Sequence, residues 1–159
     1  KKAIELINKN IHSYFKGNTI TNKHMVNAAF LSGRAINESK TTLPHALSYF
    51  MTNRYSIPHG HAVAITLGFV GKINIMSGDE KLKNVMLEIT NMLGIDVENF
   101  DQYWCELMEM GGLEVSLSKL GVKKNDLDLL IDSVNVERLK NHPISIDKST
   151  LMKELVEIF

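Results

Sequence analysis

The fold is decided by the stretch Pro58-His59-Gly60-His61-Ala62-Val63-Ala64-Ile65-Thr66-Leu67. A proline is tolerated at the start of a helix because the N–H that it lacks would be unpaired there. The residues that follow, from Ala62 to Leu67, are apolar nearly all round. A helix that is apolar on every side is buried on every side. The stretch therefore predicts a central helix that other helices enclose.

Helical spacing also dominates on both sides of this stretch, and the period-two alternation of strands is hard to find. The segment from Lys2 to Phe15 places Ile4, Ile7 and Ile11 on one face, and Gly17 follows it as a C-terminal cap would. The sequence thus predicts one all-α domain of about seven to nine helices over residues 1–159, without internal repeats. Another predicted helix begins at Thr21. Further helices are predicted at 43–52, 79–93, 97–110, 113–120, 125–134, 136–140 and 147–159.

Length and charge narrow the class of protein. The chain has 159 residues, which suits one domain, and its 18 basic and 18 acidic residues give a formal net charge of zero. Proteins that bind nucleic acid usually carry a basic excess, so no nucleic-acid partner is expected. The longest apolar runs fall well short of the roughly 20 residues that span a bilayer, so no membrane partner is expected either.

The N-terminus and the cysteine count point to the cytoplasm. Glu5 stands where a signal peptide would begin its apolar core, which argues against export. Cys105 is the only cysteine, so an internal disulfide and a site built from several cysteines are excluded. The first residue is Lys1 and not methionine, so we expect the chain to begin inside a longer protein.

Two histidines follow prolines at predicted helix starts and are candidate metal ligands. They are His45, after Pro44, and His59, after Pro58. Neutral imidazole is the commonest protein ligand for transition metals, but a catalytic zinc ion needs at least three ligands from the protein. No third ligand stands nearby in the sequence. The residues alone leave two interpretations open, a metal site short of ligands and a structural or exposed histidine pair.

The longer pattern resembles a known family. Pro44-His45-Ala46-Leu47-Ser48-Tyr49, then eight residues, then Pro58-His59-Gly60 resembles the signature of iron-containing (group III) alcohol dehydrogenases. The segment 28–36 is similar to the helix that precedes this signature. The segment 138–143 resembles the family's Arg-x-x-Asn-Asn-Pro element, with His142 in place of the second Asn. Within the family, Lys40 to Tyr49 is most similar to the branch that includes phosphonoacetaldehyde reductases.

This resemblance implies the fold and the metal site. It implies the all-helical C-terminal domain of these enzymes, with a dehydroquinate synthase-like fold, and an N-terminal NAD(P)-binding domain that is absent from this chain. Family members hold Fe²⁺, or sometimes Zn²⁺, with one Asp and three His. His45 and His59 match the last two ligands, and the others would precede Lys1. The chain would supply two ligands and one wall of the cleft, would bind NAD(P)H with none of its own residues, and would be inactive by itself.

The resemblance also suggests residues that meet the substrate, a small alcohol or aldehyde. Tyr49 stands where many members have a histidine, and its phenol could orient a substrate oxygen as a catalytic group. Lys40 and Arg54 flank the two ligand helices and could attract an anionic tail such as a phosphonate. Thr41 and Thr42 could add hydroxyl donors. The alternative interpretation is that Thr42 only caps a helix and that both cations are only solvated.

Other functions are also compatible with the sequence. The chain could be a non-catalytic helical interaction module, or the helical domain of a glycerol dehydrogenase or dehydroquinate synthase relative. The Pro-His-Gly triplet and the 14-residue spacing between His45 and His59 favour the iron-containing enzymes. Without its partner domain an apolar cleft face would be exposed, so we expect a homo-oligomer.

Overall fold

The computed structural model describes residues 1–134 and 139–159, and these ranges contain eight α-helices and no strand. The all-α prediction is confirmed. Arg138 and most of the predicted helix at 136–140 lie outside the described residues. The helices are α1 (Lys2–Phe15), α2 (Asn22–Glu38), α3 (Leu43–Tyr55), α4 (His59–Met76), α5 (Glu80–Leu93), α6 (Phe100–Met110), α7 (Leu127–Asp132) and α9 (Lys148–Glu157). Short 3-10 turns at Thr19–Thr21, Val97–Asn99 and Lys124–Asp126 precede α2, α6 and α7.

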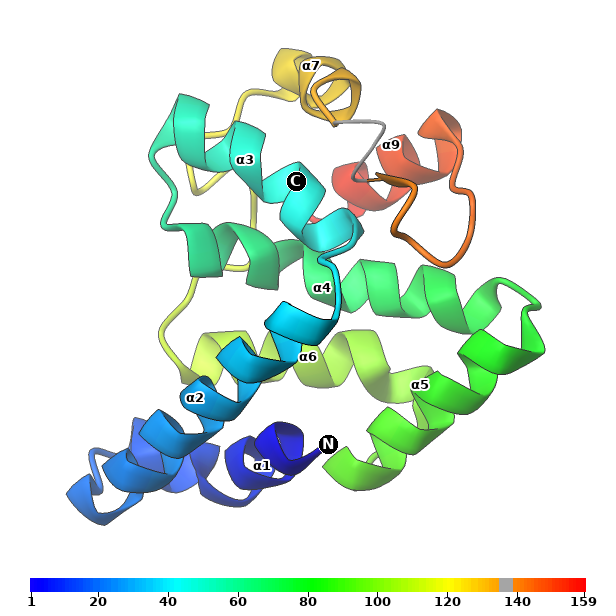
Figure 1. The fold of residues 1–159 in the computed structure, drawn as a ribbon. Coiled ribbons are helices and arrows are strands. Elements are labelled where there is room, and N and C mark those ends of the chain that lie inside the picture. Colours follow the sequence, from blue (N-terminus) through cyan, green and yellow to red (C-terminus); the bar gives the residue numbers. More distant parts are fainter. Residues whose placement is uncertain (135–138) are drawn as a thin grey trace.

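Helix α4 is the central element, as the sequence predicts. It lies between α3 and α6 and contacts both (Figure 1). Ala62, Phe69 and Val70 on α4 are almost fully buried. A short loop joins α3 to α4, and Ser56 in this loop adopts the left-handed conformation with φ of 55°. The tight connection places the start of α4 beside the body of α3.

Two glycines on α4 allow α6 to approach closely. A Cβ at Gly71 would lie 2.2 Å from Cε1 of Phe100, and a Cβ at Gly68 would lie 2.3 Å from Oδ1 of Asp101. The Phe100 ring is buried and stacks on Trp104 with ring centroids 6.5 Å apart. Because these rings have little room to shift, a side chain at Gly71 would push the two helices apart.

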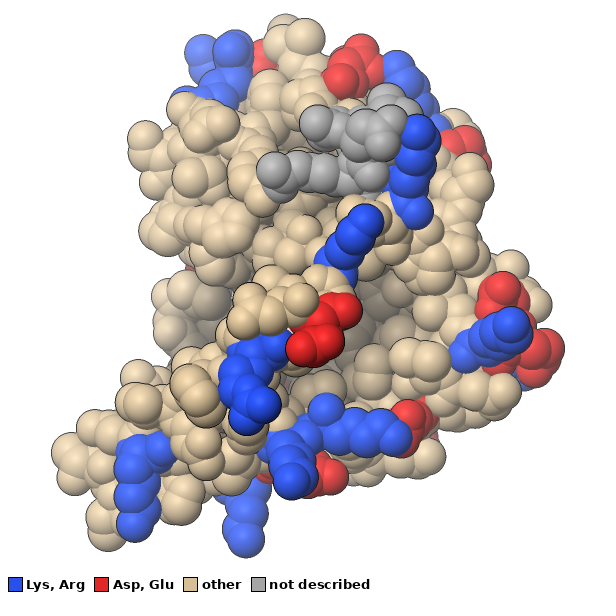
Figure 2. Space-filling view, in the orientation of Figure 1, with Lys and Arg blue, Asp and Glu red and all other residues tan. Residues whose placement is uncertain are grey.

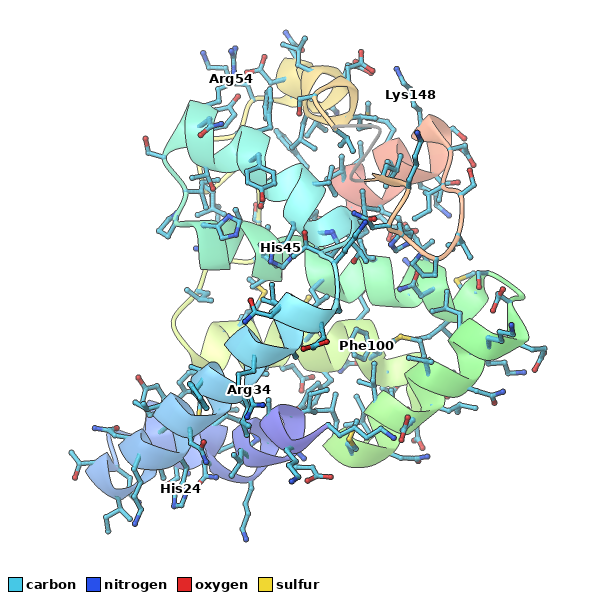
Figure 3. All side chains as sticks on the ribbon, viewed as in Figure 1. His24, Arg34, His45, Arg54, Phe100 and Lys148 are labelled. Atoms are coloured by element: carbon cyan, nitrogen blue, oxygen red, sulfur yellow. The ribbon has the colours of Figure 1, made fainter. Side chains whose placement is uncertain are left out.

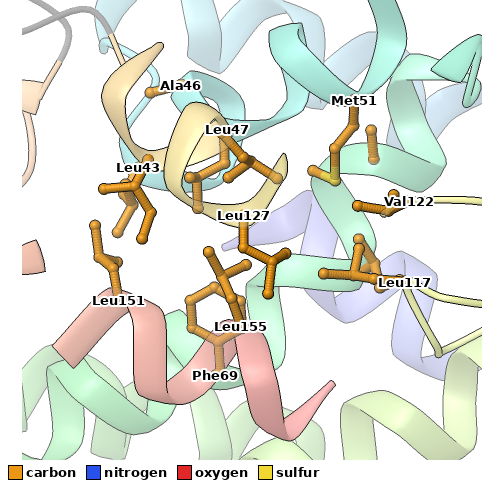
Figure 4. Packing of buried hydrophobic residues seen from close by; sticks show 14 of the residues in the cluster. Leu43, Ala46, Leu47, Met51, Phe69, Leu117, Val122, Leu127, Leu151 and Leu155 are labelled. Carbon is orange, nitrogen blue, oxygen red and sulfur yellow. The ribbon is translucent and has the colours of Figure 1, made fainter. Parts of the chain in front are cut away.

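The main hydrophobic core lies on the other side of α4 and holds α3, α7 and α9 on it (Figure 4). Phe69 of α4 belongs to this core and is 1% exposed. The residues that pack in this core include Leu43 and Leu47 of α3, Leu127 of α7, and Leu151 and Leu155 of α9. These contacts hold α3 and α4 together as a pair. Helix α2 packs chiefly on α1 and is exposed from Gly33 onward.

The predicted helical turn at 113–120 forms only in part. Residues 113–116 have no regular structure, and 117–121 is a hydrogen-bonded turn in which the Leu120 N–H donates to the Ser116 carbonyl at 3.2 Å. Two backbone N–H groups of this segment pair with the end of α9. Leu117 donates to the Ile158 carbonyl at 2.8 Å, and Ser118 donates to the Phe159 carbonyl at 3.3 Å. Pairing with the end of α9 satisfies donors that a local helix would otherwise pair internally.

The surface carries charges of both signs. Figure 2 shows Lys and Arg scattered with Asp and Glu over one face, and most of that face is uncharged. Among the described residues, no helix is long and apolar enough to cross a membrane.

Candidate functional site

The α3–α4 pair brings three aromatic side chains together. The ring of His59 lies 5.5 Å from that of His45 and 5.8 Å from that of Tyr49, measured between centroids. His45 and Tyr49 are four residues apart and share one face of α3. His59 is the first residue of α4 and returns to that face. His45 is half-buried, whereas His59 is exposed and Tyr49 is 40% exposed.

The separation of the two imidazole rings matches that expected for two histidine ligands of one metal ion. With nitrogen–metal distances near 2.1 Å and a tetrahedral angle, two such rings would have centroids about 5 Å apart. The observed 5.5 Å between His45 and His59 is close to that value. In the part of the chain that the structure describes, no group of three or more His, Cys, Asp or Glu side chains can hold an ion. A complete centre therefore needs ligands from outside these residues.

Ser48 joins the two histidines and was not singled out by the sequence analysis. Its side chain is fully buried, and its hydroxyl donates to the His45 carbonyl at 2.8 Å. The same Oγ lies 3.3 Å from Nδ1 of His59. Its position in the sequence could have indicated this role, because a residue three after His45 lies on the same side of the helix.

The polar residues before α3 lie beside His45. Thr42 occupies the N-cap position, and its carbonyl accepts the N–H groups of His45 and Ala46 at 3.1 and 3.2 Å. Its hydroxyl forms no cap hydrogen bond. Thr41 and Thr42 are half-buried, and Lys40 is exposed. This segment thus places one lysine and two threonines directly before the end of α3 that carries His45.

Arg54 lies at the other end of α3 (Figure 3). It follows His45 by nine residues, which corresponds to about 14 Å along the axis and to the opposite face of the helix. Its Nε donates to Oδ2 of Asp126 at 2.8 Å, and its guanidinium lies over the Phe50 ring. The structure therefore does not bring Arg54 to the histidines.

Asp126 ties the end of α3 to the start of α7. The Tyr55 hydroxyl and the Arg54 guanidinium both donate to its carboxylate, and these bonds lower the pKa of Asp126. The same carboxylate raises the pKa of Arg54. Arg54 therefore belongs to an ion pair that joins the end of α3 to the start of α7.

The pH dependence of stability should reveal this pair. Because the folded pKa of Asp126 lies below its ordinary value near 3.9, the stability from its ionised form is present above about pH 5 and is lost as the pH falls through the folded pKa. We expect Asp126→Asn to be less stable than the unsubstituted protein by a constant amount between pH 7 and 5, and the difference to shrink below pH 4. Urea unfolding at several pH values measures this. Asp128→Asn, on the exposed side of α7, controls for the loss of one charge, and a difference for Asp126→Asn that is as large at pH 3 as at pH 7 would contradict the expectation.

A large apolar cavity of about 500 Å³ lies between α1, α4, α5 and α6. Ile4, Ile7 and Ile11 of α1 line it, and so do Thr42 and Pro44 at the start of α3. The sequence predicts that these isoleucines share one face of a helix. The structure shows that this face borders a cavity that extends to the residues just before His45.

His142 is buried in the loop before α9. In the described structure neither of its ring nitrogens has a hydrogen-bond partner, and burial lowers its pKa. It lines a pocket of about 330 Å³ with Lys140 and Pro143. Burial therefore disfavours the charged form of this imidazole.

The chain is similar to known proteins over almost its whole length. The model for "Fe-containing alcohol dehydrogenase family, C-terminal" matches residues 1–158. Alcohol dehydrogenase 4 of Schizosaccharomyces pombe is 32% identical over 141 residues, which are 82% of this chain and 32% of that protein. Phosphonoacetaldehyde reductase of Streptomyces viridochromogenes is 44% identical over 54 residues, which are 33% of this chain and 14% of that protein.

A solved structure shows the same arrangement of helices. Sulfoacetaldehyde reductase from Bifidobacterium kashiwanohense, in complex with NAD⁺, superimposes with a TM-score of 0.83 and 25% identity. The match covers 99% of this chain and 42% of that one. The chain thus spans about a third of the length of the Schizosaccharomyces pombe protein and about two fifths of the length of the sulfoacetaldehyde reductase.

Proposed function

Since this chain belongs to the iron-containing alcohol dehydrogenase family, whose C-terminal region it matches, we propose that it is the metal-binding helical domain of an NAD(P)-linked alcohol dehydrogenase or aldehyde reductase. The observation that carries the proposal is the convergence of His45, Tyr49 and His59 on one face of the α3–α4 pair. Nucleotide binding and the remaining metal ligands belong to another part of the complete enzyme. With two ligands, the chain by itself is expected to show no turnover.

His45 and His59 would hold Fe²⁺, or Zn²⁺, together with ligands that this chain does not supply. When bound, such an ion supplies Lewis-acid chemistry, which polarises a carbonyl group and stabilises developing negative charge on its oxygen. The two rings come from helices that the main core locks together, so their separation is held by packing and not by the ion. His59 is exposed and His45 is half-buried, so this face can meet a second domain.

Tyr49 is the residue that we propose to meet the substrate. Its ring lies 5.8 Å from His59, and it is exposed on the same face of α3 as His45. A phenol can both donate and accept a hydrogen bond. In this role Tyr49 orients the substrate oxygen beside the metal site. Phenylalanine at this position would keep the ring and remove the bond.

The preferred substrate, we propose, is a small aldehyde with an anionic group. Two similar proteins are named for phosphonoacetaldehyde and sulfoacetaldehyde, which both carry such a group. Lys40, Thr41 and Thr42 offer a cation and two hydroxyl groups just before His45. Hydrogen bonds to charged groups are among the stronger ones in proteins, at about 1.5–3 kcal/mol. Arg54 is left out of this site because it lies on the opposite face of α3.

Steady-state kinetics of the complete enzyme test this site. We expect Lys40→Ala to lower kcat/KM for phosphonoacetaldehyde about 10-fold or more, and to leave kcat/KM for uncharged acetaldehyde nearly unchanged, since one charged hydrogen bond is lost. Lys23→Ala, an exposed lysine on α2, is the matched control. Equal preference for the two aldehydes in the unsubstituted enzyme and in Lys40→Ala would exclude the anion site.

A further inference from the structure

The buried hydroxyl of Ser48 has two neighbours and one proton. Its Oγ–H donates to the His45 carbonyl at 2.8 Å, which is a common bond for a serine inside a helix. The Nδ1 atom of His59 lies 3.3 Å from the same oxygen. A hydroxyl has a single donor and two acceptor lone pairs. Toward His59, therefore, Ser48 offers a lone pair.

This arrangement favours one position for the proton on the ring of His59. An accepting oxygen at Nδ1 requires an N–H at Nδ1. In a neutral imidazole, the other nitrogen, Nε2, then has no proton and keeps its lone pair. Ser48 is 0% exposed, so water does not compete for its oxygen. One buried hydroxyl is thus bonded to the backbone of His45 and to the ring of His59.

We propose that Ser48 is a positioning residue that holds His59 in the Nδ1–H tautomer and so presents Nε2 as the nitrogen that binds a metal ion. Groups that bond the second nitrogen of a ligand histidine orient its ring and select its tautomer. The part of this inference that concerns the metal rests on the proposed function. The part that concerns the tautomer rests only on the contacts of Ser48.

The chain offers a matched control for a lost buried hydroxyl. Thr90 on α5 is 1% exposed, and its hydroxyl donates to the Leu87 carbonyl three residues earlier at 3.1 Å. This bond has the same form as that of Ser48, but no imidazole contact of Thr90 is found among the described residues. Thr90→Val removes the hydroxyl and keeps the shape of the side chain.

The tautomer is measured by ¹⁵N nuclear magnetic resonance of the complete, metal-free protein labelled at histidine, with His59 assigned by its absence in His59→Ala. We expect His59 to carry its proton on Nδ1. In Ser48→Ala the ratio of Nδ1–H to Nε2–H should fall about 2- to 10-fold, as expected for the loss of one ordinary hydrogen bond. Thr90→Val should match the unsubstituted protein. A proton on Nε2 in the unsubstituted protein overturns the proposal, even if Ser48→Ala does not fold.

The metal is measured separately, by titrating the complete protein with Fe²⁺ or Zn²⁺. We expect the affinity of Ser48→Ala to be lower by about 10- to 100-fold, the range usual for groups that orient a ligand, and that of Thr90→Val to be unchanged. Equal affinity in Ser48→Ala and the unsubstituted protein overturns the role of Ser48 in metal binding. If the unsubstituted protein retains no ion, the proposed function fails, and the tautomer still tests Ser48.

Discussion

His59→Ala in the complete enzyme is expected to lower kcat/KM for an aldehyde by more than about 100-fold, because the loss of a ligand should exceed the 10- to 100-fold usual for groups that only orient one. The ring that it removes is the one that lies near both His45 and Tyr49. His59 is exposed at the first position of α4, so the substitution leaves the core intact. Metal analysis after dialysis should show the bound iron falling with the activity.

The control for this variant is His24→Ala. His24 lies on α2, away from His45 (Figure 3), and the same substitution there should change neither activity nor metal content. Circular dichroism should show equal helix content in both variants. A His59→Ala enzyme that retains one ion per chain and normal turnover would rule out His59 as a ligand.

The largest effect on stability is expected from Phe69→Ala, which should lower the free energy of unfolding by about 3–5 kcal/mol. Phe69 is 1% exposed and lies where α3, α4, α7 and α9 meet (Figure 4). Its removal leaves a cavity that the surrounding leucines of α3, α7 and α9 cannot fill, because they belong to three separate helices. Urea unfolding of the 159-residue chain should show a midpoint lower by more than about 1 M.

Phe30→Ala is the matched control, since Phe30 is 63% exposed on α2. It should change the free energy of unfolding by no more than about 0.5 kcal/mol, as surface substitutions usually do. Phe69→Leu, which keeps part of the volume, should fall between the two and serves if Phe69→Ala does not fold. Equal losses at Phe69 and Phe30 would show that the core is not centred on Phe69.

Local sequence determined where most helices begin and end. Gly94 stops α5 in the left-handed conformation, and Asp79 and Asp147 cap α5 and α9 through their side chains. These are interactions between residues close in the chain, so a local pattern suffices to predict them. The full course of the segment 113–120 could not be predicted in this way, because the N–H groups of Leu117 and Ser118 pair with the distant end of α9.

Some residues of the candidate site could likewise be predicted from local sequence, and others could not. The spacing of Pro44-His45 and Pro58-His59 was enough to single out both histidines, since each stands at a helix start that its proline marks. Sequence proximity also suggested Arg54, but the helix places it on the opposite face from His45, where Asp126 pairs with it. Ser48 drew no attention because its partners are defined by the return of α4.

The sequence by itself thus determined the class of the fold, the central helix and the two histidines, because helical period, caps and prolines act over a few residues. Only the tertiary structure decided how far apart His45 and His59 lie, that Ser48 joins them, and that Arg54 stays away. Those features depend on how α3 packs against α4 and α7, and this packing is set by buried contacts between residues far apart in the chain.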